Sequence, residues 1–182
     1  MAVANPQDEK SIYTRSSTYP NVMNRNVPGS VMMDRDRIDQ IPWYEGPHLP
    51  GLKIKYLWID INAGMSASIF RISKGVQLPV HAHYSTVWLY CHSGSFTYEA
   101  GTIGPGGFGY EPFGVIHEPD VTVAEETEMF LLGSSHNRIQ LYEEDGTPGI
   151  SFTTRETLKG IRESCGEAGV AHLNLPTWFW QD

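Results

Sequence analysis

Three histidines in the middle of the chain have the type and spacing of a metal-binding group. His81 and His83 lie in the segment PVHAHY. Side chains two residues apart on a β-strand point to the same side, about 6 to 7 Å apart, so both imidazoles can reach one ion. His117, in the segment PFGVIHEP, can supply a third ligand from a neighbouring strand. Neutral imidazole binds iron, zinc, copper or nickel, so the sequence predicts transition-metal chemistry.

Short apolar runs separated by turns must position these histidines. We expect strands over residues 52–61, 66–73, 86–92, 95–99, 128–133, 139–142 and 150–152. The sequence Asn62-Ala63-Gly64 predicts a hairpin between the first two runs. Helical patterns do not alternate with these runs, which favours a sandwich or barrel over a parallel sheet. The pattern therefore predicts an all-β domain.

Two appendages flank the predicted barrel, which we place at residues 45–152. Residues 1–44 are polar and unpatterned, so we expect an N-terminal arm that lies on the domain or on a partner subunit. Residues 153–182 are expected to form a short C-terminal helix and an aromatic tail. The helix begins with a Thr153–Glu156 capping box, and the tail sequence Trp-Phe-Trp is expected to dock on the barrel or on another subunit.

Length and charge exclude several classes of protein. The 182 residues suit one domain, and a hydrophobic share of 40% can bury a core. Thirteen basic and 21 acidic residues give a net charge of -8, and the basic residues are scattered, which argues against nucleic-acid binding. The chain shows neither a membrane-spanning run nor a secretory signal, so we expect a cytoplasmic protein. Two cysteines cannot make a disulfide framework.

Read together with the glycines around them, the histidines resemble the two signature motifs of the cupin superfamily. The first motif consists of Gly75, His81, His83, Val87 and Gly94, and the second of Gly106, Pro112, Gly114 and His117. Every fixed glycine, proline and histidine is in place. The resemblance implies a single cupin jelly-roll barrel, antiparallel and small, with a metal held by side chains that project inward.

Two positions depart from the cupin pattern. Val87 stands where glutamate is usual, and Val121 stands where asparagine is usual. Without that glutamate, three neutral histidines leave the full charge of a divalent metal uncompensated. Such a charge in an apolar cavity favours an anionic chelating ligand, because the attraction grows as the dielectric falls. Enolates of β-diketones and deprotonated α-hydroxyketones are ligands of this kind.

In size, motif and aromatic-rich ending, the chain resembles the 2,4'-dihydroxyacetophenone dioxygenase group, and acetylacetone dioxygenase more distantly. This resemblance implies Fe(II) at the three histidines. It also implies that molecular oxygen cleaves a carbon-carbon bond next to the carbonyl of a small ketone, which gives two carboxylic acids. Two alternatives stay open. One is a cupin with zinc or another divalent metal that acts as a non-redox polyketide cyclase or isomerase, and the other is a metal-binding cupin sensor module.

Five further residues are candidates for the surroundings of the metal. Glu111 is the catalytic candidate: it can orient a ligand histidine or receive the α-proton of the substrate, unless it is a surface residue in a turn. Tyr98 either hydrogen-bonds a substrate oxygen or fills the barrel. Arg71 either neutralises a substrate carboxylate or lies at a sheet edge. Val87 and Leu89 share the alternation of the first two histidines and should form an apolar wall.

Side chains of the opposite alternation should face away from the metal, and Trp88 and Tyr90 are among them. The remaining histidines are expected outside the site: His48, His92, His136 and His172. Outward aromatic residues and the Trp-Phe-Trp tail give more apolar surface than a monomer usually tolerates. We therefore expect a homodimer or homotetramer.

Overall fold

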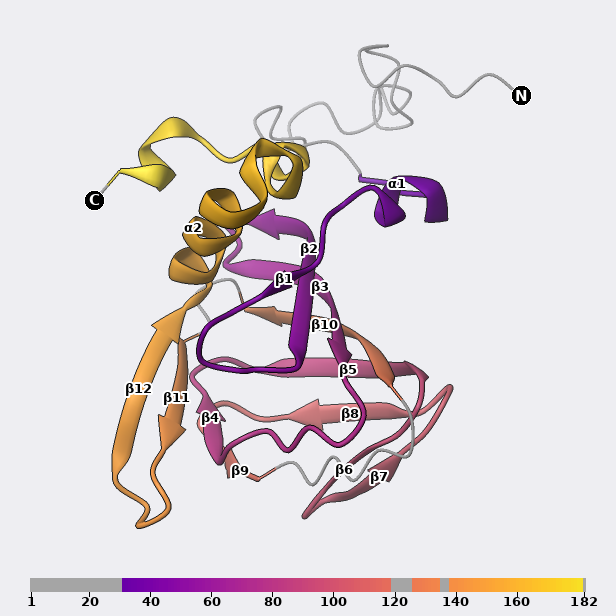
Figure 1. Ribbon diagram of the computed structural model, residues 1–182, viewed down its shortest axis with the longest axis vertical. Helices are drawn as coiled ribbons and strands as arrows, with labels where there is room; N and C mark the ends of the chain where they lie inside the picture. Colours follow the sequence, from indigo (N-terminus) through magenta and orange to yellow (C-terminus); the bar gives the residue numbers. More distant parts are fainter. Residues whose placement is uncertain (1–30, 119–125, 135–137, 182) are drawn as a thin grey trace, which may run out of the picture. The chain divides into compact units, whose positions relative to one another are not determined.

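The computed structural model describes residues 31–118, 126–134 and 138–181 (Figure 1). The chain divides after Asp34, and all the helices and strands described below belong to the unit Arg35–Asp182. The predicted arm therefore falls mostly outside the described residues. Its last part contains one short helix, α1 (Arg35–Asp39).

The larger of the two main sheets has six strands, and all its neighbouring strands are antiparallel. Their order across the sheet is β1 (Tyr44–Glu45), β2 (Leu52–Asp60), β3 (Met65–Ile72), β10 (Thr127–Ser134), β5 (Val87–Ser93) and β8 (Phe108–Glu111). The predicted hairpin joins β2 to β3. Its turn is held by Asp60, whose Oδ1 accepts the backbone N–H groups of Asn62 and Ala63 at 2.9 Å each. Figure 1 shows these strands side by side, from β1 and β2 near α2 to β8 at the far edge.

The second main sheet has four strands and carries two of the three histidines on its shortest interior strand. Its order is β12 (Pro148–Thr153), β11 (Arg138–Tyr142), β4 (His81–His83) and β9 (Ile116–His117). A separate hairpin pairs β6 (Phe96–Tyr98) with β7 (Gly101–Ile103).

The fold is mostly β, as predicted, but the expectation of a barrel needs correction. Each sheet ends at two edge strands, and the described ladders do not join one sheet to the other. Between β8 and β9 the chain turns at residues 112–115 and passes from the six-stranded to the four-stranded sheet, so these two short strands are edges of different sheets and do not pair with each other. The sheets therefore face each other without closing into a continuous ring.

The predicted C-terminal helix is α2 (Thr154–Cys165). Its capping box is present: the Glu156 N–H is bound by the Thr153 hydroxyl at 3.2 Å, and the Thr153 N–H is bound by the Glu156 carboxylate at 2.7 Å. Three short 3-10 turns follow, at Gly166–Gly169, Ala171–Leu173 and Thr177–Trp180. Among the described residues, no helix has the length and apolar character needed to span a bilayer.

The buried apolar residues form two clusters against the inner face of the six-stranded sheet. One cluster surrounds the histidines and includes Leu89, Met129 and Leu131. The other packs α2 and the C-terminal turns against β2, with Leu158 fully buried and Phe179 only 8% exposed. The aromatic tail thus docks through Phe179, whereas its neighbour Trp178 stays 60% exposed.

Candidate metal centre

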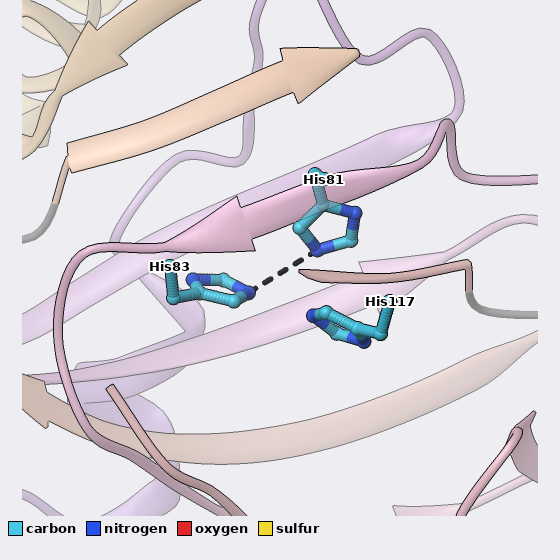
Figure 2. Close-up of side chains that lie close together, drawn as sticks. All are labelled: His81, His83 and His117. Atoms are coloured by element: carbon cyan, nitrogen blue, oxygen red, sulfur yellow. Dashed lines mark hydrogen bonds between the residues drawn. The ribbon is translucent and has the colours of Figure 1, made fainter. Parts of the chain in front are cut away.

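Strand pairing brings the three histidines to one side of the four-stranded sheet. His81 and His83 are separated by one residue on β4, so their side chains share a side. His117 on β9 stands directly opposite His81 in the antiparallel ladder. Figure 2 shows the three rings gathered at one point from these two strands.

The three imidazoles are close enough to share one ion. One ligand nitrogen from each lies within 4.8 Å of the others, and the ring centroids are 4.3 to 5.5 Å apart. All three residues are buried, with exposed fractions of 3 to 7%. The group can therefore hold a metal ion.

The hydrogen bonds of the rings fit a metal-binding role. The Nδ1–H group of His81 donates to the carbonyl of Pro79 at 2.7 Å, which leaves Nε2 with its lone pair towards the group. That Nε2 lies 3.2 Å from the Nε2 of His83. Both ring nitrogens of His117 are buried without a hydrogen-bond partner among the described residues. Because buried polar atoms are normally satisfied, a His117 ring without hydrogen-bond partners beside two other imidazoles matches the donor set of a transition metal.

Burial also keeps these rings in the form that binds metals. It lowers the pKa of His81, an effect that the Pro79 carbonyl partly opposes. Burial, followed by the neighbouring His81, lowers the pKa of His117 to about 4. At neutral pH both imidazoles are therefore neutral, and a metal does not have to displace protons from them.

Glu111 brings a carboxyl group to the same point from the other sheet. It lies on β8 directly opposite Val87 of β5, and its Oε2 is 3.5 Å from the Nε2 of His83 and 3.9 Å from the Nε2 of His117. It is only 5% exposed, so it is not a surface residue. Burial raises the pKa of its carboxyl group to about 7. Cupins usually have a glutamate at the position of Val87. Here Glu111, which is paired with Val87 across the ladder, brings a carboxyl group to the site instead.

The space beside the histidines is small and mostly apolar. Its volume is about 40 Å³. Besides the histidines and Glu111, its lining consists of Leu49, Leu52, Phe70, Ile72, Leu78, Leu89, Phe96, Met129, Leu131 and Ile139. Leu89 lines this space, while Val87 is buried in the surrounding cluster. Tyr98 packs edge-on against the His117 ring, with centroids 5.3 Å apart.

Arg71 lies on the outer face of the six-stranded sheet, away from the histidines. Its Nη2 is 2.7 Å from a carboxylate oxygen of Glu128, and its guanidinium lies 4.2 Å from the centre of the Trp43 ring. Alternation explains the placement, because the flanking residues Phe70 and Ile72 line the metal cavity. The structure therefore does not place Arg71 where it would neutralise a substrate at the metal.

Several lining residues lie outside the two motifs and were not identified from sequence. Ile139 stands opposite His83 in the ladder between β11 and β4, and Met129 comes from the centre of the six-stranded sheet. The sequence places both residues in predicted strands. It does not show which strands pair with one another, and this pairing is what brings them next to the histidines. Val121 and His136, two positions considered from the sequence, lie outside the described residues.

The other described histidines lie apart from the metal group. His48 stacks on Phe152, with ring centroids 5.6 Å apart. The Nε2 of His172 is 2.7 Å from the carbonyl of Tyr56. His92 lies on the outer side of β5 and is exposed.

Comparison with known proteins agrees with this fold. Residues 33–137 match the family described as the ChrR cupin-like domain. An RmlC-like cupin protein from Ralstonia eutropha JMP134 is 18% identical, with a TM-score of 0.65, over 75% of this chain and 87% of that one. A protein of unknown function with a cupin-like fold, from the same organism, is 26% identical, with a TM-score of 0.54, over 63% of this chain and 75% of that one.

A further similar structure is an acetylacetone dioxygenase from Acinetobacter johnsonii. It is 14% identical, with a TM-score of 0.59, over 76% of this chain and 93% of that one. At this identity the similarity is one of fold alone. Comparison with curated proteins gave no match.

Proposed function

Because the chain belongs to the ChrR cupin-like domain family, we propose that it is a metal-dependent enzyme, an iron(II) dioxygenase that cleaves a carbon-carbon bond next to a carbonyl group. The substrate class is an α-hydroxyketone or a β-diketone. The observation that carries this proposal is the buried group of three imidazoles with one carboxyl group beside it. The fold shared with an acetylacetone dioxygenase supports the same reaction class.

The three histidines would bind the metal, and their neutrality determines which substrate suits it. Because imidazoles bring no charge, a divalent ion keeps its attraction for an anion with two oxygens. An enolate, or a deprotonated α-hydroxyketone, is such an anion. Iron(II) held by the three histidines would allow molecular oxygen to react with a closed-shell ketone, and the electrons that reduce the oxygen would come from the ketone as its carbon-carbon bond breaks.

Glu111 is the residue that we assign to proton transfer. Its carboxyl group lies 3.5 Å from the imidazole nitrogen of His83, so a ketone bound at the ion would present its α-proton within reach. Movement of that proton to the carboxylate would leave an anionic substrate next to the metal. The overall charge of the site would stay constant, since one negative charge replaces another.

The apolar lining has two effects on this chemistry. It excludes water, which strengthens the attraction between the ion and an anionic substrate. Its volume of about 40 Å³ holds an ion and little more, so a substrate must displace lining side chains. Small ketones are therefore favoured over bulky ones.

Oxygen consumption tests the proposal directly. The full chain is loaded with iron(II) under anaerobic conditions and then mixed with oxygen and a panel of β-diketones and 2-hydroxyacetophenones. We expect oxygen uptake that depends on the ketone and equals the amount of carbon-carbon cleavage. Absence of uptake with every ketone in the panel would overturn the proposal.

Glu111→Gln tests the role of the carboxyl group, and Glu99→Gln is the matched control. Glu99 is an exposed glutamate near the same histidine segment, where it accepts the Glu118 N–H at 3.2 Å. We expect the first variant to keep its iron and lose roughly 100- to 10,000-fold in turnover, the usual range for general acid-base groups. The control should resemble the wild type. If Glu111→Gln lost its iron as well, the carboxylate would be a ligand and the charge argument for a ketone would fail.

Zinc is the second candidate metal, because the all-imidazole donor set suits it equally well. With zinc the site would act as a Lewis acid in a non-redox step such as an isomerisation or a cyclisation. Elemental analysis of protein purified without added metal separates the two proposals. Zinc as the main metal, together with turnover that is independent of oxygen, would favour this alternative.

A further inference from the structure

The outer face of the six-stranded sheet carries many apolar side chains beside a row of charged ones, Lys53, Arg71 and Glu128. Residues that stand opposite one another on neighbouring strands form two rows across this face. One row is Trp58, Ala67, Leu132, Trp88 and Tyr110, and the other is Lys55, Ile69, Phe130, Tyr90 and Phe108. Antiparallel sheets usually have one face in contact with the core and a polar face in contact with water. Here the two rows on the outer face are also largely apolar.

Five aromatic side chains in these rows remain exposed. Their exposed fractions lie between 37% and 62%, for Trp88, Tyr90, Phe108, Tyr110 and Phe130. At roughly 200 Å² for a buried aromatic residue, they leave about 500 Å² of apolar surface in water. That area is at the upper end for a monomer, and two such faces in contact would bury about 1,000 Å², the lower limit of a specific interface.

The charge distribution on this face permits contact between identical copies. The two rows contain a single charged residue, Lys55, which is only 4% exposed and donates to the carbonyl of Ile38 at 3.0 Å. At the border of the rows, Arg71 is paired with Glu128 at 2.7 Å. The net charge of -8 therefore resides mainly elsewhere on the chain. Two copies can meet here without burying unpaired carboxylates, which would be costly.

The face also has a hollow and, on its edge strand, an exposed aromatic side chain that forms a ridge. The hollow has a volume of about 240 Å³; its apolar lining includes Trp43, Ile69, Tyr90 and Phe130, and its polar lining includes the ion pairs Arg35–Asp39 and Arg71–Glu128. The ridge is Phe108 on the edge strand β8, which is 62% exposed. A cavity of roughly 150 Å³ already accepts a benzene ring. In a twofold arrangement each copy can place its ridge against the hollow of the other, because an isologous interface uses the same surface twice.

We propose that a second copy of this chain packs face to face on the outer surface of β2, β3, β10, β5 and β8, and that Phe108 of each copy enters the hollow of the other. The resulting dimer buries the aromatic rows on both sides. This inference is independent of the metal and of the reaction, since it involves only the face that points away from the histidines.

Phe108→Asp tests the proposal, with Phe113→Asp as the matched control. Phe113 is 65% exposed, but it lies in the turn between β8 and β9 and not in either row. The molar mass of the full-length protein is measured by sedimentation over a dilution series. We expect the wild type and the control to be dimers, or dimers of dimers. Phe108→Asp should raise the dimer dissociation constant by about 30-fold or more, the effect of removing one aromatic anchor from an interface.

Hydrogen exchange of the wild-type protein provides a second measurement, in case the aspartate variant does not fold. We expect the amides of β8, the edge strand, to lose protection when the protein is diluted into its monomeric range. A monomeric wild type, or a dimer that withstands Phe108→Asp, overturns the proposal. The proposal is also overturned if the wild type is monomeric and the amides of β8 lose protection only when residues 1–30 are removed. In that case residues 1–30 of the same chain, and not a second copy, would cover the outer face.

Discussion

The two faces of the six-stranded sheet differ in what covers them, although both carry many apolar side chains. On the inner face Leu89 and Met129 are 3% and 2% exposed, beneath the second sheet and the metal group. On the outer face the neighbouring residues Tyr90 and Phe130 are 47% and 38% exposed. The same strands supply both sets by alternation. Apolar residues in a strand therefore predict that both faces of the sheet are removed from water. Only the fold shows which face is buried by the rest of the same chain.

The largest difference between the faces should appear in metal binding. His83→Ala removes one of three nitrogen ligands on the inner side, whereas His92→Ala removes an exposed histidine on the outer side of β5. We expect the first variant to lose more than about 100-fold in metal affinity, beyond the effect of changing an outer partner of a ligand. The second variant should keep the wild-type affinity. Metal content and competition with a chelator measure both, and equal losses would contradict a site confined to the inner face.

The next difference should appear in stability. Leu89→Ala leaves a cavity in the core and should lower the free energy of unfolding by about 2 to 5 kcal/mol. Tyr90→Ala, one position along the same strand, removes a side chain that is half exposed in a single chain. Measured at concentrations where the protein is monomeric, it should cost less than about 1 kcal/mol. Chemical denaturation gives both values, and a Tyr90→Ala cost as large as that of Leu89→Ala would mean that the chain itself covers the outer face.

A smaller effect concerns the helix that covers part of the inner face. Thr153→Ala removes the hydroxyl that binds the Glu156 N–H at the start of α2. Loss of an N-cap side chain costs about 1 kcal/mol. Thermal unfolding monitored by circular dichroism measures this cost. Thr153→Ser keeps the hydroxyl and should restore most of the stability, and failure to do so would assign the effect to packing of the methyl group.

The smallest expected effect is a pH dependence at the C-terminal turns. Burial lowers the pKa of His172, an effect that its bond to the Tyr56 carbonyl partly opposes. The unfolded chain then binds more protons than the folded chain just below the ordinary histidine pKa, so stability falls as the pH drops through about 6.5. We expect metal-free wild-type protein to lose more stability between neutral and mildly acidic pH than His172→Gln. Equal losses would show that His172 does not titrate with folding.

Much of the fold followed from short-range sequence patterns. Alternating apolar runs predicted most strands to within a residue or two, and the capping box predicted the start of α2. The short strands β1, β7 and β8 were not predicted, because two to four residues show no clear period, and β4 and β9 were expected only through their histidines. The closed barrel was wrong for a related reason: closure depends on pairing between edge strands, and local patterns do not specify such pairing.

The site could be predicted in part. His81, His83 and His117 were identified by spacing, and the structure brings them together. Arg71 could be placed only once the alternation of β3 was fixed by its neighbours. The distance of Glu111 from the imidazoles could not be predicted from the sequence either, because it depends on the registers of the β5–β8, β4–β9 and β11–β4 ladders.

The pairing of Val87 with Glu111 bears on how such sites are recognised. Two positions that face each other across a ladder can exchange one functional group without moving it far in space. A sequence motif that covers only β5 then shows no carboxylate at position 87, although Glu111, the residue paired with it on β8, carries one. Surveys that sort metal sites by linear signature would group this chain with proteins that lack an acidic neighbour, whereas a classification by three-dimensional position would separate them.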